Sequence, residues 1–315
     1  MTGARILAFG GYQPDKVVTN DDLAKTVDTN DEWIRSRVGS ESRRVAADDE
    51  TVADMAEAAG AKALAASGLA PSSIDLVIVA TCSPEVPLPN VAATVAYRLG
   101  IVAPGAYDLN AACAGFCYAL ATASDSIRAG SARHALVIGA EKMTDWLDWN
   151  DRSTCIIFAD GAGAAVVGPT ADGEPAGIGP VVWGSAGDQA EKITIPSRTG
   201  AIRQDGQAVF RWATTALHPV ALEACARAGV TPADISAFVP HQANLRIIEA
   251  IARKLGIPRE RLADDITHAG NTSSASIPLA LSRLAEQGRL QPGTPALLLG
   301  FGAGLSYAAQ VITVP

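Results

Sequence analysis

The sequence predicts an α/β fold built from two copies of one β/α half-domain. Segments typical of strands and helices alternate along the 315 residues, which is the pattern of α/β proteins. The second half also repeats the first at a nearly constant offset. Residues 65–74 match residues 226–235 at an offset of 161 positions, and the same offset relates Asn110 to Asn271. A shared offset over some 75 residues indicates a duplication.

The composition is that of a globular protein without a general affinity for polyanions. The chain is 48% hydrophobic and 18% charged, with a formal net charge of −8, so an anionic ligand has to meet a local basic patch. The five cysteines are scattered, without a Cys-x-x-Cys pair or a His/Cys cluster. We therefore expect neither a zinc site nor a disulfide framework, and a reducing cytosol fits best.

The first half is expected to contain the following elements in order. Residues 74–80 form a continuous apolar run, as in a strand buried on both faces. An alanine-rich helix precedes it over residues 50–67, and Gly68 is its C-cap signal. The other expected elements are a strand at 5–9, a polar, partly helical segment at 20–38, a helix at 90–99, an extended run at 106–109, a helix at 116–128 and a strand at 134–139.

Two glycine-rich stretches need a separate interpretation. The run at 155–167 lacks the Gly-Lys-Ser/Thr and Gly-x-Gly-x-x-Gly signatures of phosphate loops, and two strands of small residues are expected there. Residues 295–315 carry no charge and are long enough to span a bilayer, but Gly300, Gly302 and Gly304 interrupt them. We interpret this stretch as two buried strands joined by a glycine turn.

Cys113 is the main candidate for chemistry. It lies in Asn-Ala-Ala-Cys-Ala-Gly-Phe, among small residues between an extended run and a helical run. If the helix begins at Cys113, its free N–H groups and dipole stabilise a thiolate there. The alternative is a small buried hydrophobic residue, which is the usual state of an intracellular cysteine.

The repeat places two more polar residues beside Cys113. The strand at 74–80 corresponds to residues 235–240, so His241 follows the carboxyl end of a buried strand. Asn271 corresponds to Asn110 and precedes the equivalent of the Cys113 helix. Because α/β sheets build their sites at the carboxyl ends of strands, we expect Cys113, His241 and Asn271 to lie together.

Four motifs carry a resemblance to a known family. They are Asn-Ala-Ala-Cys-Ala-Gly-Phe, His-Gln-Ala-Asn-Leu-Arg (241–246), Gly-Asn-Thr-Ser-Ser-Ala-Ser-Ile-Pro (270–278) and Gly-Phe-Gly-Ala-Gly-Leu-Ser-Tyr (300–307). The chain thereby resembles β-ketoacyl-acyl-carrier-protein synthase III, and its alanine-rich sequence is similar to actinobacterial members. The resemblance implies the thiolase fold, with five layers α-β-α-β-α and halves at 1–168 and 169–315.

The resemblance also implies the reaction and its central residues. Cys113 would take a primer acyl group from coenzyme A, and His241 and Asn271 would hold the malonyl thioester oxygen. The tetrahedral oxygen on the acyl group would bind the backbone amides of Cys113 and Ala303. The expected enzyme initiates fatty-acid synthesis by joining an acyl-CoA to malonyl-acyl carrier protein, with loss of carbon dioxide.

Further residues receive roles from the resemblance. Trp33, Arg37 and Arg152 would bind the coenzyme A nucleotide, with Asn244 at the tunnel mouth. Arg246 would meet the acidic carrier protein. Leu88, Met143 and Phe158 would form the acyl pocket, with Leu88 reaching into the neighbouring subunit of a homodimer. No metal or redox cofactor is implied, and the expected location is cytoplasmic.

Several alternatives stay open at this point. A polyketide starter-unit priming synthase or an O-acyltransferase would carry the same three central residues. A degradative thiolase usually has a second active-site cysteine in a late turn, and residues 300–307 contain none. A catalytically inactive partner subunit would not need intact Cys113, His241 and Asn271. Cys117 is expected to pack in the core, and His268 is expected to have no role in the site, with support of Asn271 as the alternative.

Overall fold

The protein is described by a computed structural model covering residues 3–197 and 199–315. Its two principal sheets have the orders β1-β7-β6-β4-β5 and β8-β13-β12-β11. In each, a parallel pair (β4–β6 or β11–β12) is followed by an antiparallel partner (β7 or β13). The strands are β1 (Ala4–Tyr12), β4 (Leu76–Ala80), β5 (Gly105–Leu109), β6 (Ala135–Lys142), β7 (Asp160–Pro169), β8 (Val182–Ser185), β11 (Ala237–Pro240), β12 (Pro295–Gly302) and β13 (Ser306–Thr313).

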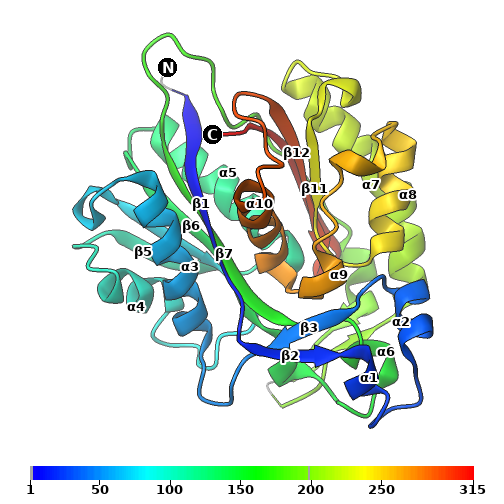
Figure 1. The fold of residues 1–315 in the computed structure, drawn as a ribbon. Coiled ribbons are helices and arrows are strands. Elements are labelled where there is room, and N and C mark those ends of the chain that lie inside the picture. The colour runs from blue at the N-terminus through cyan, green and yellow to red at the C-terminus, as the bar shows by residue number, and fades with distance from the viewer. Residues whose placement is uncertain (1–2, 198) are drawn as a thin grey trace.

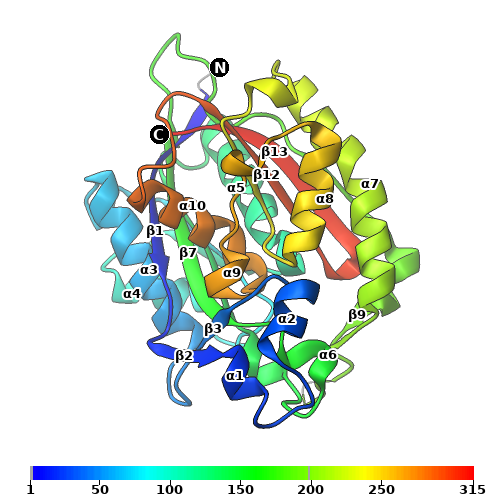
Figure 2. The same ribbon diagram turned by 45° about the vertical axis from the view of Figure 1, so that its right-hand side comes forward.

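The helices complete five layers. In Figure 1, α5 and α10 lie between the two sheets, and Figure 2 shows α7 and α8 outside the second sheet. Helices α3 and α4 cover the outer face of the first sheet. The predicted α-β-α-β-α arrangement is therefore confirmed. The helices are α3 (Val52–Ser67), α4 (Val91–Arg98), α5 (Gly115–Arg128), α7 (Gly206–Arg227), α8 (Leu245–Leu255) and α10 (Ser276–Glu286).

The duplication extends to details of the backbone. The 3-10 turn Ala112–Ala114 before α5 has its counterpart in Ser273–Ala275 before α10. Both turns begin with a non-glycine residue at positive φ, +46° at Ala112 and +51° at Ser273. These matching turns, one from each half, meet at the centre of the molecule.

Local signals explain where the helices begin and end. Thr51 caps α3 in a capping box with Asp54, and Gly68 ends it at φ +70°, as the sequence predicts. Asn90 caps α4 by accepting from the Ala93 N–H. The apolar faces of these helices pack on strands that are wholly buried, such as β4.

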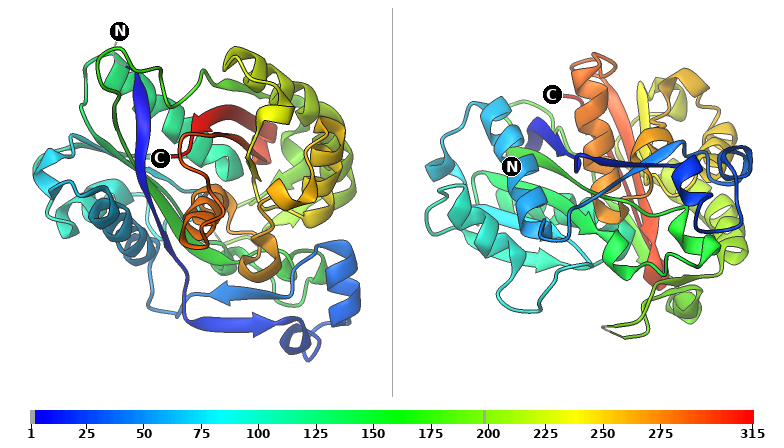
Figure 3. Two further views of the ribbon diagram at one scale, coloured as in Figure 1. Left: turned by 45° about the horizontal axis from the view of Figure 1, so that its top comes forward. Right: turned by 60° about the horizontal axis from the view of Figure 1, so that its bottom comes forward.

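One part of the first half packs on the second. Strands β2 (Lys16–Thr19) and β3 (Ser42–Val45) and helices α1 (Asn20–Leu23) and α2 (Asp31–Arg37) extend from the first sheet. Figure 3 shows them projecting from the body of the fold. The apolar side chains Leu23, Ile34 and Val38 join the hydrophobic core around α7 and α8. This projecting segment therefore places α2 against the second half of the fold.

The structure corrects the prediction for residues 155–167. In place of two short strands there is one long strand, β7, preceded by the short helix α6 (Arg152–Cys155). Gly163 does not mark a turn: a Cβ there would lie 2.3 Å from the Leu279 nitrogen. The glycine is needed because α10 crosses the strand closely, and this packing between distant segments is invisible in local sequence.

The C-terminal stretch forms β12 and β13, joined by a turn, as predicted. Within the described residues, no helix has both the length and the apolar character needed to cross a membrane.

Candidate active site

Cys113 lies in the turn between a strand and a helix. Strand β5 ends at Leu109, and the Asn110 side chain accepts a hydrogen bond from the Ala112 N–H (3.1 Å). Helix α5 begins at Gly115, one residue before the predicted helix at 116–128, and Cys113 belongs to the preceding 3-10 turn and not to the helix. The chain therefore holds the sulfur at the end of the first sheet and just before the central helix.

Opposing influences act on the Cys113 thiol. Burial raises its pKa to about 12, while hydrogen bonds from the Ser273 side chain and from the backbone N–H groups of Cys113 and Ala303 act in the lowering direction. The helix does not begin at Cys113, so the condition for a helix-stabilised thiolate is not met, and loss of solvation outweighs the hydrogen-bond donors. The approach of Ala303 depends on its neighbour: a Cβ on Gly302 would lie 2.7 Å from Cys113 Cβ.

His241 follows β11 and is almost wholly buried. Its Nδ1 lies 2.7 Å from Ser276 Oγ, and its ring meets Phe301 edge-on at 5.3 Å. Burial lowers the pKa of His241 to about 3. The imidazole is therefore neutral at physiological pH, and a ring nitrogen that carries hydrogen serves as a neutral donor.

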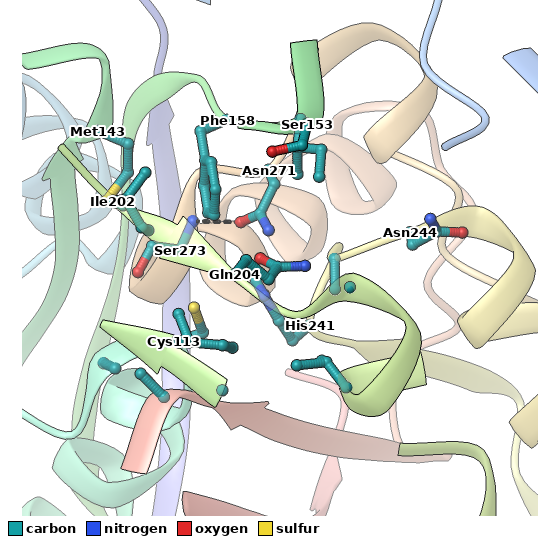
Figure 4. Close-up of a pocket in the computed structure, with 18 of the residues that line it drawn as sticks. Cys113, Met143, Ser153, Phe158, Ile202, Gln204, His241, Asn244, Asn271 and Ser273 are labelled. Atoms are coloured by element: carbon teal, nitrogen blue, oxygen red, sulfur yellow. Dashed lines mark hydrogen bonds between the residues drawn. The ribbon is translucent and has the colours of Figure 1, made fainter. Parts of the chain in front are cut away.

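Asn271 is fixed by hydrogen bonds at its backbone and its side chain. Its N–H donates to the Ile157 carbonyl (3.0 Å), and its carbonyl accepts from the Ala159 N–H (2.9 Å). Its side-chain oxygen accepts from the Ser273 N–H (2.9 Å). The side-chain nitrogen of Asn271 therefore points away from Ser273. Figure 4 shows it directed toward the His241 side of the cavity.

One cavity of about 1040 Å³ contains these three side chains. The prediction that Cys113, His241 and Asn271 lie together agrees with this placement, and Ala303 lines the same space. Figure 4 shows Cys113, His241 and Asn271 around its inner end, with Met143, Phe158 and Ile202 to one side. The outer part is lined by Trp33, Arg37, Arg211, Asn244 and Arg246.

The residues expected to bind the nucleotide form a cluster at the outer end. The guanidinium carbons of Arg152 and Arg37 lie 4.8 and 5.8 Å from the centre of the Trp33 ring. A planar base between indole and guanidinium needs a spacing of about 7 Å, two van der Waals contacts. Arg152 therefore has to move off the ring before a base can stack between them.

Asn244 and Arg246 lie at the N-terminus of α8. Asn244 Oδ1 accepts from the Arg246 N–H (2.9 Å), and Asn244 Nδ2 donates to the Arg37 carbonyl (2.8 Å). Asn244 thus links α8 to α2. The Arg246 guanidinium lies 5.3 Å from the centre of the Phe210 ring.

The predicted acyl-pocket residues separate into two places. Met143 and Phe158 are buried beside Ile202 in a small hydrophobic cluster next to the inner cavity. Leu88 lies outside the cavity of its own chain and is 80% exposed. Its expected position in a neighbouring subunit's pocket stays a prediction.

Sequence reasoning missed several residues around the inner cavity. Glu141, at the end of β6, is fully buried and accepts from the hydroxyls of Ser83, Ser273 and Ser274. Cys82 lines the cavity, and its thiol lies 3.3 Å from the same carboxylate. A charged residue straight after a continuous apolar strand was the available signal for Glu141.

Cys117 and His268 both lie outside the cavity lining. Cys117 is fully buried, one helical turn beyond Cys113. His268 is exposed at the surface, with Nδ1 3.9 Å from a Glu41 carboxylate oxygen. It does not contact the cavity residues described above.

Comparison with known proteins gives a consistent result. Two family models match, 3-oxoacyl-[acyl-carrier-protein] synthase III over residues 107–187 and its C-terminal model over residues 225–314. A β-ketoacyl-[acyl-carrier-protein] synthase III of Streptomyces coelicolor is 55% identical, covering 99% of both chains. A Mycobacterium avium synthase III is 47% identical and covers all of this chain and 96% of the relative.

Solved structures agree with the sequences. The priming β-ketosynthase of the R1128 polyketide pathway superposes with a TM-score of 0.96 at 45% identity, covering 99% of this chain and 96% of the other. The synthase III of Thermus thermophilus gives 0.93 at 44% identity, covering 99% of both. The chain belongs to the β-ketoacyl-acyl-carrier-protein synthase III family of thiolase-fold acyltransferases, and it initiates fatty-acid synthesis by condensing an acyl-CoA with malonyl-acyl carrier protein.

Proposed function

We propose that Cys113 carries the primer and that His241 and Asn271 act on the malonyl thioester. The observation that carries this proposal is the convergence of the three side chains on one buried cavity. Cys113 sulfur attacks the acyl-CoA carbonyl, the bond to coenzyme A breaks, and the thiol proton passes to the departing coenzyme A thiolate. The N–H groups of Cys113 and Ala303 would hold the oxyanion of each tetrahedral intermediate.

The second half-reaction needs donors but no strong base. Loss of carbon dioxide moves an electron pair from the breaking C–C bond into an enolate, whose oxygen accepts from Asn271 Nδ2 and His241 Nε2. The enolate carbon then attacks the acyl-Cys113 carbonyl, the bond to sulfur breaks, and the released Cys113 thiolate takes up a proton from solvent. A histidine whose pKa is about 3 is a poor proton acceptor, which favours the donor role.

The half-reactions separate in variants. His241→Ala and Asn271→Ala should still take an acyl group on Cys113 but should condense about 100- to 1000-fold more slowly. Intact-protein mass and 3-oxoacyl product formation measure the two steps. Cys113→Ser is the matched control: it should lose acyl transfer while retaining decarboxylation of malonyl-carrier. Normal condensation by either of the first two variants would remove that residue from the enolate site.

The outer cavity is proposed to bind the coenzyme A nucleotide and the carrier protein. Trp33, Arg37 and Arg152 form the nucleotide clamp, and Arg246 is the residue that we assign to the acidic carrier. Arg211 lies at the same cavity wall and adds positive charge. On a chain of net charge −8, this local group of arginines is the kind of patch that an anionic ligand requires.

A homodimer is proposed from the edge of the first sheet. Strand β5 is the last strand in its sheet, and exposed edge strands invite pairing with another chain. Tyr97, Val102 and Leu88, on the segments around β5, are 85%, 76% and 80% exposed. Pairing of two β5 edges would cover apolar surface and would bring Leu88 toward the partner's acyl pocket.

The five thiols are all free, which suits the cytosol that we propose as location.

A polyketide priming role is the second candidate, because the superposition on a priming ketosynthase is as close as that on a fatty-acid enzyme. The two candidates differ in the carrier protein that delivers the malonyl group. Condensation rates with a fatty-acid carrier and a polyketide carrier, measured with the same acyl-CoA, would separate them. A preference for the polyketide carrier would support the priming role, and a preference for the fatty-acid carrier would contradict it.

A further inference from the structure

Ser276 is the only hydrogen-bond partner of the His241 ring among the described residues. Its hydroxyl lies 2.7 Å from His241 Nδ1, and both side chains are almost fully buried, with exposures of 1% and 2%. Ser276 is the first residue of α10, so the central helix fixes its position. A second contact reaches the same oxygen, the N–H of Gln242, at 3.2 Å.

The hydrogen-bond count determines which ring nitrogen carries the proton. The Gln242 N–H can only donate, so Ser276 Oγ accepts there. If the hydroxyl also accepted from His241, its own hydrogen would be buried without an acceptor, since the described part of the chain offers that oxygen no third partner. A buried donor without an acceptor is unfavourable, because it loses its hydrogen bond to water and gains none in return. The favoured arrangement is donation from the Ser276 hydroxyl to Nδ1, which leaves the hydrogen of the neutral imidazole on Nε2.

We infer that Ser276 is a positioning residue that fixes His241 in the Nε2–H tautomer and so supplies the donor for the enolate oxygen. The inference rests on the proposed role of His241. Serine acts here through the histidine and does not touch the substrate. Without it, Nδ1 would compete for the hydrogen, and an Nε2 lone pair would face the developing negative charge.

The other half of the duplicated fold supports this assignment. At the offset of 161, Ser276 corresponds to Gly115 and His241 to Ala80. A Cβ on Gly115 would lie 3.1 Å from Ala80 Cβ, so the fold places these two positions against each other in both halves. The half with Cys113 has no polar group at either position. The half with His241 has a polar pair, which is expected if the pair serves the reaction and is not needed to form the fold.

The direct test is the tautomer of His241. The chain has four histidines, so ¹⁵N-histidine NMR gives few signals, and His241→Gln identifies the one that matters. The wild-type protein should show neutral His241 with hydrogen on Nε2. A wild-type signal with hydrogen on Nδ1 would overturn the inference, whether or not any variant folds.

The kinetic test uses Ser276→Ala, with Ser276→Cys and Ser282→Ala as comparisons. Loss of the hydroxyl should slow condensation by roughly 10- to 100-fold, as for other partners that orient a reacting group, while acylation of Cys113 changes by less than about twofold. Cysteine, a weak donor, should restore part of the rate. Ser282 lies on the same helix, is 3% exposed and contacts Glu286, so its removal should change neither step.

The outcomes distinguish this inference from the proposed function. Slow condensation in His241→Ala with a wild-type rate in Ser276→Ala would overturn the inference and retain the role of His241. Normal condensation in His241→Ala would overturn the proposed role of His241 on the malonyl thioester. Equal losses of acylation and condensation in Ser276→Ala would show a structural role and would also overturn the inference.

Discussion

At the sulfur of Cys113, burial acts against hydrogen bonds from the Ser273 side chain and two backbone N–H groups, and burial prevails. Its pKa of about 12 keeps the thiol protonated at neutral pH. In the proposed mechanism, Cys113 reacts with a substrate that fills the cavity and takes up the thiol proton with its leaving group. A freely ionised thiolate would instead react with any small electrophile.

This state predicts the pH dependence of alkylation. A thiol whose pKa is raised from 9.0 to about 12 is charged only above that pH, so its reactivity with iodoacetamide should rise about tenfold per pH unit from pH 7 to 10 without levelling off. The rate is read on the Cys113 peptide by mass spectrometry. Cys82→Ser removes the other thiol of the cavity as a control. A plateau near pH 7 or 8 would show a stabilised thiolate and contradict the account.

The three central residues were predictable because they lie in distinctive short motifs and because the repeat placed His241 after a buried strand and Asn271 before the counterpart of the Cys113 helix. The ionisation of Cys113 was not predictable in the same way. It depends on how many atoms surround the sulfur, and these come from β12, from β13 and from the turn at Ser273. Ser276 and Glu141 were missed for the same reason: their partners are distant in sequence.

At the scale of elements, α2, α6 and α8 form the outer part of the site. The family resemblance indicated the residues of the proposed clamp but not their present arrangement. In the structure Arg152 covers the Trp33 ring, and Arg152 Nη1 also lies 3.5 Å from an Asp28 carboxylate oxygen. These contacts are among exposed groups, so they are weak enough for an incoming nucleotide to displace.

The clamp predicts a selective change in substrate affinity. Arg37→Ala and Arg152→Ala should raise the KM for acyl-CoA by roughly 5- to 30-fold, corresponding to about 1–2 kcal/mol of lost contact. The KM for malonyl-carrier should change much less. Arg227→Ala, on the exposed face of α7, is the matched control. Equal changes in both KM values would assign the two arginines to folding and not to the nucleotide.

At the scale of the whole molecule, the duplication brings the two halves of the site together. Gly139 of β6 packs against the Ser274 turn, where a Cβ would lie 2.4 Å from its carbonyl oxygen. Its counterpart Gly300 of β12 packs against the Ala114 turn, where the corresponding distance to Cα is 3.0 Å. In each sheet, a glycine thus leaves room for the turn of the other half to pack against the strand. The repeat predicted this symmetry, while the packing of α2 onto the second half required the three-dimensional structure.

A prediction about the primer depends on the proposed dimer. If Leu88 of one protomer closes the acyl pocket of its partner, a flexible leucine leaves more room than a flat aromatic ring. One methylene is worth only ~1–3 kcal/mol in such a pocket, so the effect is a broadened preference. We expect isobutyryl-CoA to be accepted alongside acetyl-CoA, and Leu88→Phe to shift the competition toward acetyl-CoA.

The primer prediction is checked by competition between the two acyl-CoAs in the wild type and in Leu88→Phe, with sedimentation confirming that both are dimers. Rejection of isobutyryl-CoA by the wild type would contradict it. An unchanged ratio in the variant would show that Leu88 does not set the pocket.

The central claim is that one cysteine holds the primer while the other half of the molecule prepares the nucleophile. The most direct measurement is the intact mass of the protein after acetyl-CoA is added and again after malonyl-carrier is added, with the acyl group located by peptide mapping. The account predicts one acetyl group on Cys113 that disappears on the second addition as 3-oxoacyl-carrier forms. An acetyl group on another residue, or one that malonyl-carrier fails to discharge, would contradict it.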